Sequence, residues 1–498
     1  MYYYFPMTLS ITSIPSPVSQ VTKKLKDAGF ESYLVGGCVR DLFIGRTPKD
    51  WDITTNATPE QIIAIFPDSF YENTFGTVGV KTESEDPTLK VIEITPYRLE
   101  SEYTDKRRPD AVEWSKTLDH DLKRRDFTVN AIAIDERDGK LDIIDLFHGQ
   151  EDLENKVIRT VGDPHLRFSE DALRIMRAIR LSVELGFHVE HETEVAIKTH
   201  AKLLGHISKE RIRDEFSKII LSPHPEDGIS FMRNTGILPF VIPELEEGFG
   251  MEQNQAHSYD VWTHTLKTVQ HSADKQFPFE IRLAALLHDI GKPRTRRFSR
   301  ETNQYTFYGH EVVGAKMANE ILERLKFPRK TIEIVTKLVR WHMFFSDPEA
   351  ITLSAVRRMV VNVGKEHIWD LMNVRNCDRI GTGRPKENPY RLRKYKSMID
   401  EALRDPITVG MLKIDGKDIM EALKDRPGPK IGLILNALME EVLDNPAKNT
   451  REWLLERTHE LAQEDEATLK KQAAIGKDKK DQAEEAELKK IRGKHKVQ

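Results

Sequence analysis

The chain has 498 residues, of which 39% are hydrophobic and 31% are charged, and its formal net charge at pH 7 is −4. This length predicts three or four compact units, and the composition is that of a globular protein with a sizeable core. The slightly acidic balance excludes a chain that is basic throughout, so any nucleic-acid surface must come from local clusters of Lys and Arg.

The sequence argues against a disulfide-stabilised protein and against a membrane-spanning protein. Cys38 and Cys377 are the only cysteines and lie far apart in the sequence, which argues against a disulfide framework and fits a reducing cytosol. The sequence has no apolar run of about 18 residues, so we expect no membrane-spanning helix. The N-terminal segment lacks a basic stretch and contains prolines, which argues against a secretory signal. We therefore expect a cytoplasmic protein.

Residues 18–148 predict a mixed α/β domain. A helix is expected at 19–28, followed by an apolar strand at 33–35, a Gly-Gly turn and a short helix. Further strands are expected in short segments rich in β-branched residues, namely 51–53, 78–81, 90–95 and 131–134.

The rest of the chain has helical spacing. In the segment 169–220, Leu173, Met176 and Ile179 lie on adjoining turns. After about residue 463, Lys, Glu and Ala dominate, and we expect a solvated helix or disorder there, with partial disorder favoured. The expected domains are 18–148, 149–230, 231–400 and 401–462, with a charged extension at 463–498.

Acidic residues on two expected strands predict a magnesium site. Asp50 and Asp52 are two residues apart, and on a strand such residues face the same side. Two like charges are unfavourable together unless a cation neutralises them, and Mg²⁺ prefers one or two carboxylates together with substrate phosphates. Glu93, in the segment VIEITPYR, is a candidate third ligand. The alternative is a solvated pair of Asp side chains at the end of a strand.

Glycine and arginine residues near these strands suit a nucleotide. Gly36 and Gly37 lie between a strand and a helix, where backbone N–H groups can approach a phosphate, although most such pairs are simple turns. Arg124, Arg125 and Asp126 precede another strand. Guanidinium groups suit a triphosphate, and a carboxylate suits ribose hydroxyls.

A further acidic and basic set lies in RFSEDALRIMRAIR (167–180). Asp171, Arg174 and Arg177 are spaced three residues apart, so we expect them on one face of a helix. The alternative is ordinary Asp–Arg pairing on the surface of that helix.

Six motifs occur in the order found in one enzyme family. They are GGCVRD (36–41), GRTPKDWDI (45–53), EITPYR (93–98), YTDKRRPD (103–110), RRDFT (124–128) and EDALRIMRAIR (170–180). Together they resemble class II tRNA nucleotidyltransferases, the CCA-adding enzymes, which share their head with bacterial poly(A) polymerases. The resemblance implies an α+β fold: a nucleotidyltransferase (polymerase-beta-like) head with a mixed sheet, followed by all-helical neck, HD and tail domains.

The resemblance implies template-independent addition of C, C and A to the 3′ end of tRNA, from CTP and ATP with release of pyrophosphate. Asp50 and Asp52 would hold two Mg²⁺ ions, one activating the RNA 3′-hydroxyl and one clamping the leaving pyrophosphate, and Glu93 would complete or orient that cluster. The triphosphate would lie against Gly36, Gly37, Arg40 and Arg125. Arg40 could instead be a structural partner of Asp41 or Asp50.

The resemblance also implies a way to choose the base. Asp126 would meet the ribose, and Asp171 and Arg174, with Arg177 beside them, would select the base. Cytosine and adenine both present an amino donor next to a ring-nitrogen acceptor, which a carboxylate and a guanidinium can match. Guanine and uracil present a carbonyl there, so Asp171 would face another acceptor. The charged segment 98–112 resembles the family's flexible loop, which helps admit ATP and argues against a strictly CC-adding enzyme.

A second set of His and Asp residues lies between 257 and 380. Its members are His264, His288, Asp289, His310, His342 and Asp378. Imidazoles and carboxylates distributed in this way suit a divalent metal that hydrolyses phosphate esters. The pattern resembles the HD phosphohydrolase superfamily, which implies a divalent transition metal or Mg²⁺ and a phosphatase or 2′,3′-cyclic phosphodiesterase activity. The alternative is an HD fold kept only as a platform for tRNA.

Residues 414–455 resemble the tail of bacterial CCA-adding enzymes, which would contact RNA, or form a helical module without such contact. The expected partners are tRNA, CTP and ATP, with neither DNA nor a membrane. The rivals are a poly(A) polymerase or A-adding enzyme, and a non-catalytic RNA-binding or nucleotide-sensing scaffold, which would be expected to lose its carboxylates.

Overall fold

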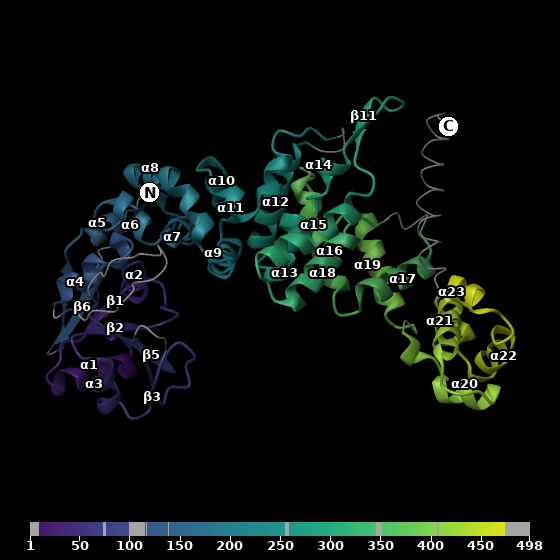
Figure 1. The fold of residues 1–498 in the computed structure, drawn as a ribbon, viewed down its shortest axis with the longest axis horizontal. Helices are drawn as coiled ribbons and strands as arrows, with labels where there is room; N and C mark the ends of the chain where they lie inside the picture. Colours follow the sequence, from purple (N-terminus) through teal and green to yellow (C-terminus); the bar gives the residue numbers. More distant parts are fainter. Residues whose placement is uncertain are drawn as a thin grey trace. The chain divides into compact units, whose positions relative to one another are not determined.

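The computed structural model describes residues 9–72, 76–98, 115, 117–137, 139–253, 258–344, 351–405 and 408–473. The chain forms two compact units, Met1–Glu246 with Arg324–Lys326, and Glu247–Glu323 with Phe327–Gln498. The first unit contains a large sheet and helices, and the second is mainly helical (Figure 1). The domain boundary that we expected at residue 230 therefore lies inside the first unit.

A mixed sheet of seven strands forms the head of the first unit. In chain order the strands are β1 (Tyr33–Val35), β2 (Asp52–Thr55), β3 (Ser69–Tyr71), β4 (Val78–Lys81), β5 (Val91–Pro96), β6 (Ile132–Arg137) and β7 (Lys140–Asp145), and in space they follow the order β3-β4-β5-β2-β1-β6-β7. β2 and β5 pair in parallel, whereas the other neighbours are antiparallel. The predicted mixed sheet is confirmed, and β3 and β7 are edge strands that we had not predicted.

Short helices cover this sheet. They are α1 (Ser16–Asp27), α2 (Gly37–Phe43), α3 (Pro59–Ile65), α4 (Leu118–Lys123) and α5 (Gly149–Glu154). In α1, Val18, Val21 and Leu25 are buried at helical spacing, which is the stripe that packs against a core. This helix begins three residues before the predicted start, and Pro17 fits its first turn because the first N–H groups need no partner within the helix.

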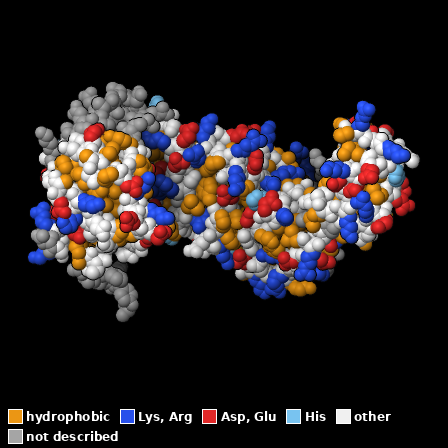
Figure 2. Space-filling view, turned by 90° about the horizontal axis from the view of Figure 1, so that it is seen from below, with side chains coloured by type: hydrophobic (Ala, Val, Ile, Leu, Met, Phe, Trp, Pro, Cys, Tyr) orange, Lys and Arg blue, Asp and Glu red, His pale blue; other side chains and the backbone are white. Residues whose placement is uncertain are grey.

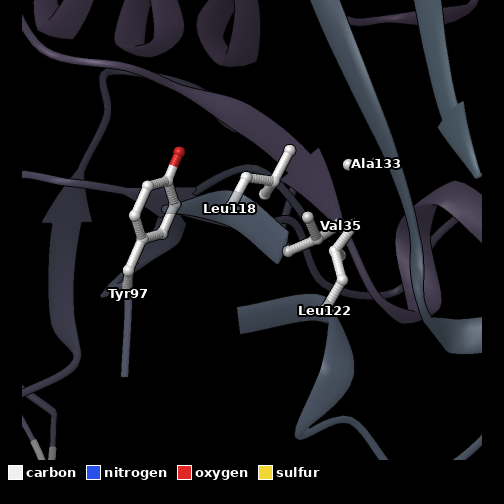
Figure 3. Packing of buried hydrophobic residues seen from close by; sticks show 5 residues of the cluster. All are labelled: Val35, Tyr97, Leu118, Leu122 and Ala133. Atoms are coloured by element: carbon white, nitrogen blue, oxygen red, sulfur yellow. The ribbon is translucent and has the colours of Figure 1, made fainter. Parts of the chain in front are cut away.

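A hydrophobic cluster holds α4 against the sheet (Figure 3). It joins residues from β1, α4, β6 and the end of β5, namely Val35, Tyr97, Leu118, Leu122 and Ala133. Leu118 and Leu122 are four residues apart and therefore share one face of α4. The residues that follow α4 are thereby held close to β1 and β2.

Helices make up most of the remainder of the first unit. They are α6 (Pro164–Glu170), α7 (Leu173–Leu185), α8 (His191–His200), α9 (Lys209–Leu221), α10 (Pro225–Asn234) and α11 (Leu238–Val241), and they are joined by a parallel pair of two-residue strands, β8 (Val157–Ile158) and β9 (His188–Val189). In α7, Met176 and Ile179 are fully buried, as the helical spacing predicts. Gly186, with φ of 72°, ends α7 in the left-handed conformation that glycine favours.

The second unit contains helices and one hairpin. Its elements up to residue 402 are α12 (Val261–Asp274), α13 (Phe279–Leu287), α14 (Lys292–Thr295), β10 (Arg297–Ser299), β11 (Gln304–Thr306), α15 (His310–Arg324), α16 (Arg329–Trp341), α17 (Leu353–Val363), α18 (Ile368–Gly381) and α19 (Tyr390–Ala402). Every residue of α13 from Ile281 to Leu287 is buried. Such a helix belongs at the centre of a core, and it delivers the His288–Asp289 pair directly after its last turn.

The last elements are α20 (Gly416–Leu423), α21 (Pro429–Asp444), α22 (Arg451–Leu461) and α23 (Glu466–Ala473). α23 lies within the expected charged extension, and its Leu469 is fully buried. The extension therefore contributes to the packed core over part of its length. Within the described ranges, no helix has both the length and the apolar character that a membrane crossing needs. Figure 2 shows Lys and Arg side chains interspersed with Asp and Glu over the visible face.

Candidate functional site

Three carboxylates come together where β2 and β5 lie side by side. Asp52 is the first residue of β2 and the register partner of Glu93 in β5, so both side chains leave the same face of the sheet. Asp50 stands in the loop before β2, rather than in the strand where we expected it. Burial, together with repulsion from Asp50 and Glu93, raises the pKa of Asp52 to about 7. The structure thus gathers the three predicted acidic residues in one place.

A glycine turn and an arginine adjoin these carboxylates. Gly36 has φ of 80°, and a Cβ atom built on it would lie 3.1 Å from Oδ2 of Asp52 and 3.3 Å from Nη1 of Arg125. A side chain at this position would therefore be strained and crowded. Glycine lets the backbone between β1 and α2 approach both the carboxylate and the guanidinium group. Gly37 follows as the first residue of α2.

Asp121 in α4 orients this arginine, although we did not single it out from the sequence. Its carboxylate is fully buried and accepts hydrogen bonds from Arg124 at 2.9 Å, from Arg125 at 3.0 Å and from Thr54 of β2 at 3.1 Å. Burial alone would raise the pKa of Asp121, but Arg125 and Arg124 hold it below its ordinary value. The signal was in the sequence, because Asp121 precedes the two arginines by three and four residues.

Asp126, which we expected to meet the ribose, belongs to a buried network. Its Oδ2 accepts a hydrogen bond from Nε of Arg177 at 2.7 Å, and its Oδ1 accepts one from Nδ2 of Asn130 at 3.3 Å. Although burial favours the neutral acid, Arg177 and Arg174 hold the pKa of Asp126 well below its usual range. The carboxylate that we expected at the ribose therefore holds Arg177 in place.

Arg40 lies at the other end of the same network. Its Nε and Nη2 atoms donate to Oδ1 of Asp41 at 2.9 and 2.8 Å, and its Nη1 donates to Asn130 at 2.8 Å. Arg40 is also buried. The structure therefore contains the alternative pairing with Asp41 that the sequence left open.

Asp171 and Arg174 have separate partners. Asp171 follows the last residue of α6 with an extended backbone, and α7 begins only at Leu173. Our prediction that Asp171, Arg174 and Arg177 share one helical face is therefore wrong for Asp171. Its Oδ2 accepts from Arg211 at 2.8 Å, a residue of α9 that the sequence did not point to.

Arg174 connects α7 to the segment that follows α4. Its Nη1 donates to Glu170 at 2.7 Å, and its Nη2 donates to the carbonyl of Arg124 at 3.1 Å. Arg125 is next in the chain and lies beside Asp52. The three residues from Arg124 to Asp126 thus connect the carboxylate cluster to α7. The expected flexible loop, 98–112, lies outside the described residues except for Arg98, which donates to Thr77.

The six His and Asp residues of the second unit form one buried cluster. Two groups of potential ligand atoms each lie within 4.8 Å of one another, namely His264, His288 and Asp378, and Asp289, His310 and His342. Asp289 joins the groups, because its Oδ2 lies 3.0 Å from Nε2 of His264 and its Oδ1 lies 3.2 Å from Nε2 of His310. All six residues that the sequence predicted as ligands therefore meet.

The hydrogen bonds around these imidazoles suit a cation. Nδ1 of His310 and Nδ1 of His342 each donate to a backbone carbonyl at 2.7 Å, so Nε2 of both rings is turned inward, and these Nε2 atoms are 3.2 Å apart. Burial lowers the pKa of His342 to about 4, so its Nε2 carries a lone pair at neutral pH. Two inward nitrogen atoms beside a carboxylate at this distance are the donor set of a divalent metal site.

The comparisons with known proteins agree with this division of the chain. Three family models match: "Poly A polymerase head domain" over residues 32–159, "Probable RNA and SrmB- binding site of polymerase A" over 186–249, and "HD domain" over 255–372. A CCA-adding enzyme of Geobacillus thermodenitrificans is 32% identical over 445 residues, which cover 88% of this chain and 96% of that protein. The chain belongs to the CCA-adding enzyme family.

Two further relatives show the range of this similarity. The crystal structure of the CCA-adding enzyme of Bacillus stearothermophilus in complex with CTP has a TM-score of 0.68 and 29% identity, and the match covers 90% of this chain and 99% of that one. A CC-adding tRNA nucleotidyltransferase of Thermus thermophilus is 33% identical over 418 residues, which cover 82% of this chain and 89% of that protein. The predicted family and α+β fold class are confirmed.

Proposed function

We propose that this chain adds C, C and A in turn to the 3′ end of tRNA, using CTP and ATP and releasing pyrophosphate. The observation that carries the proposal is the meeting of Asp50, Asp52 and Glu93 beside Arg125, in a member of the CCA-adding family. Membership alone does not set the product, because one relative is named a CC-adding enzyme. The order and number of added nucleotides must therefore be measured.

Asp50, Asp52 and Glu93 are the residues that would hold Mg²⁺. Burial raises the pKa values of Asp52 and Glu93, and so does repulsion from other carboxylates, which are Asp50 and Glu93 for Asp52 and Glu72 and Asp50 for Glu93. A bound divalent cation relieves such repulsion. When bound, Mg²⁺ supplies positive charge for the attacking hydroxyl and for the leaving pyrophosphate. Arg125, oriented by Asp121, would bind the triphosphate next to these carboxylates.

Asp171 and Arg174 are the residues that would read the base. Each carboxylate oxygen can accept two hydrogen bonds, so Asp171 can accept from the amino group of cytosine or adenine while Arg211 holds it in place. Glu170 orients the guanidinium of Arg174 in the same way. Arg211 and Glu170 therefore act as positioning residues for this pair.

The assay for this proposal uses the purified chain, tRNA that lacks CCA and each labelled nucleotide in turn. Addition of two C and one A, followed by arrest, is the expected result. A long A tail would make the chain a poly(A) polymerase, and addition that stops after C and C, or that requires an existing CC end, would make it a CC-adding or A-adding enzyme. Absence of incorporation in the presence of Mg²⁺ would favour the alternative of a non-catalytic scaffold that binds RNA or senses nucleotides.

A second activity, hydrolysis of phosphate esters, is favoured by the His/Asp cluster of the second unit. We propose that His264, His288, Asp289, His310, His342 and Asp378 hold a divalent metal, whose chemistry when bound is to activate water and polarise a phosphoryl group. Although burial opposes it, Asp289 and Asp378 raise the pKa of His288 to about 10, so the cluster attracts positive charge. Water would add across a P–O bond, opening a 2′,3′-cyclic phosphate or releasing a terminal phosphate.

The phosphohydrolase proposal is tested on the full chain with Asp52→Ala, so that nucleotide addition does not interfere. The substrates are bis(p-nitrophenyl) phosphate and 2′,3′-cyclic AMP, with Ni²⁺, Co²⁺, Mn²⁺ or Mg²⁺ added separately. Turnover with at least one metal is expected, and Asp289→Asn should abolish it. Inertness with all four metals would contradict the proposal and favour an HD fold that serves as a platform for tRNA.

A further inference from the structure

The hairpin of β10 and β11 carries arginine and aromatic side chains that neither site uses. Phe298 and Tyr305 are register partners, and their rings meet edge to face with centroids 5.4 Å apart. The guanidinium carbon of Arg296 lies 3.5 Å from the centroid of the Tyr305 ring. Arg296 directly precedes β10, so it reaches the Tyr305 ring from the start of the hairpin. The Tyr305 ring therefore contacts both the Arg296 guanidinium group and the Phe298 ring, and Phe298 is 53% exposed.

The charge of this segment is strongly positive although the whole chain is slightly acidic. Between residues 292 and 309 the basic residues are Lys292, Arg294, Arg296, Arg297 and Arg300, and the single acidic residue is Glu301. Lys292 and Arg294 pair with Asp289 and Glu247, so the exposed positive charge of the hairpin comes from Arg297 and Arg300. A local excess of arginine attracts the phosphate groups of a nucleic acid even when the whole protein carries a negative net charge.

The residues on either side of the hairpin contact the His/Asp cluster. Before β10, Nζ of Lys292 lies 2.5 Å from Oδ2 of Asp289. After β11, the carbonyl of Phe307 accepts the hydrogen bond that orients His310, and the neighbouring Tyr308 is 69% exposed. Figure 1 shows the hairpin projecting beyond α14. A strand of RNA along the hairpin would therefore lead to the cluster.

We infer that the β10–β11 hairpin binds the single-stranded 3′ end of RNA and delivers its terminal phosphate to the His/Asp cluster. Exposed aromatic rings that stack bases, together with arginines that bind the backbone, are the combination with which proteins hold single-stranded RNA. Arginine stacked on an aromatic ring adds a flat cationic surface for a base. The delivery step rests on the proposed phosphohydrolase function, whereas the RNA contact does not.

The test compares a large and a small substrate of the same site. The triple variant Phe298→Ala/Arg297→Ala/Arg300→Ala should lower kcat/KM at least tenfold, mainly through KM, on a tRNA that ends in a 2′,3′-cyclic phosphate. Its rate on bis(p-nitrophenyl) phosphate should stay within twofold of the wild-type rate. The matched control, Phe298→Tyr/Arg297→Lys/Arg300→Lys, keeps the ring and the charges and should retain most of the activity on RNA. Equal losses on both substrates, or an unchanged rate on RNA, would overturn the inference.

A second readout separates this inference from the phosphohydrolase proposal. If the wild-type chain hydrolyses neither substrate, that proposal fails, and the RNA contact is judged by photo-crosslinking alone. With tRNA that carries 4-thiouridine near its 3′ end, a crosslink should map to the peptide 296–308 of the wild-type chain and be lost in the triple variant. Crosslinks that map only to other peptides would contradict an RNA-binding role of the hairpin.

Discussion

The surroundings of Asp52 disfavour the ionised form of its side chain. Burial, with Asp50 and Glu93 nearby, raises its pKa from 3.8 to about 7, and Arg125 offsets this only in part. Between these pH values the folded chain binds more protons than the unfolded chain, so the stability of the metal-free protein falls as the pH rises through this window. This repulsion is the physical reason to expect a cation here.

Asp52→Asn removes that repulsion, so we expect it to raise the melting temperature of the metal-free protein. The increase over wild type should be small at pH 5 and larger at pH 7.5. Mg²⁺ should stabilise the wild-type chain more than the variant, because a cation that binds the native state shifts the folding equilibrium. Thermal unfolding in EDTA and in Mg²⁺ measures both effects, and a variant that melts below wild type at pH 7.5 in EDTA would contradict the account.

The base-reading role of Asp171 predicts a change in specificity. Asp171→Asn places an amide, which can both donate and accept, where the carboxylate only accepts. The ratio of kcat/KM for CTP to that for UTP should therefore fall by at least tenfold, because the carbonyl of uracil gains a donor. Single-nucleotide incorporation on tRNA lacking CCA measures this ratio. An unchanged ratio with a lower rate for both nucleotides would assign Asp171 a structural role.

At the level of elements, α4 positions Arg124 and Arg125 through Asp121. Asp121→Asn leaves two arginines without their buried counter-charge, and we expect it to lower the free energy of unfolding by about 3 kcal/mol. Under conditions where the variant is folded, KM for CTP should rise, because Arg125 loses the partner that orients it. Denaturant unfolding and steady-state kinetics measure the two effects.

Asp119→Asn is the matched control for this prediction. Asp119 is exposed on the same helix, two residues before Asp121. Its substitution should change the free energy of unfolding by less than about 0.5 kcal/mol, as is usual at the surface. Equal effects of the two substitutions would show that the Asp121 network does not hold the arginines.

Elements were predictable from the sequence where burial imposes a pattern. β4 and β5 have buried β-branched or aliphatic residues and were expected within a residue of their observed ends. β3 and β7 are edge strands whose side chains are mostly exposed or half-buried, so they lack the hydrophobic signal. Glu93 was expected as a third ligand because it lies on a second predicted strand, whereas its register with Asp52 was visible only in the structure.

Contacts between residues far apart in the chain could not be predicted from the sequence. The chain between α6 and α7 breaks at Asp171 without glycine or proline, so the helical spacing of residues 170–180 predicted a continuous helix. Arg211 meets Asp171 from α9, forty residues later in the chain. Asp126 is of a type that suits ribose, but its partner Arg177 is visible only in the folded structure. The residue types therefore indicated the chemistry of the site. Which of these side chains bind to one another within the protein depends on tertiary packing, which the sequence does not show.

On the scale of the whole molecule, the two candidate sites lie in separate compact units. The carboxylate cluster is built by strands of the first unit, and the His/Asp cluster is built by helices of the second. Because they share no residue, each substitution should act on one activity alone. With both proposed activities, the chain would trim damaged tRNA ends at one site and rebuild them at the other.

Asp289→Asn tests this independence. It should abolish phosphate-ester hydrolysis and lower the content of bound divalent metal, because Asp289 contacts both groups of ligands. The rate of nucleotide addition should remain within twofold of wild type. Elemental analysis of the purified chain and the two activity assays give the answer, and loss of addition in a folded variant would contradict two independent sites.

The proposed nucleotidyltransferase centre consists of Asp50, Asp52 and Glu93. The most direct measurement is incorporation of labelled CTP and ATP into tRNA lacking CCA by the wild-type chain and by Asp52→Ala, with circular dichroism to show that both are folded. Wild type should add C, C and A, and the rate of addition by the variant should be lower by at least a thousandfold. Undiminished addition by folded Asp52→Ala would contradict it.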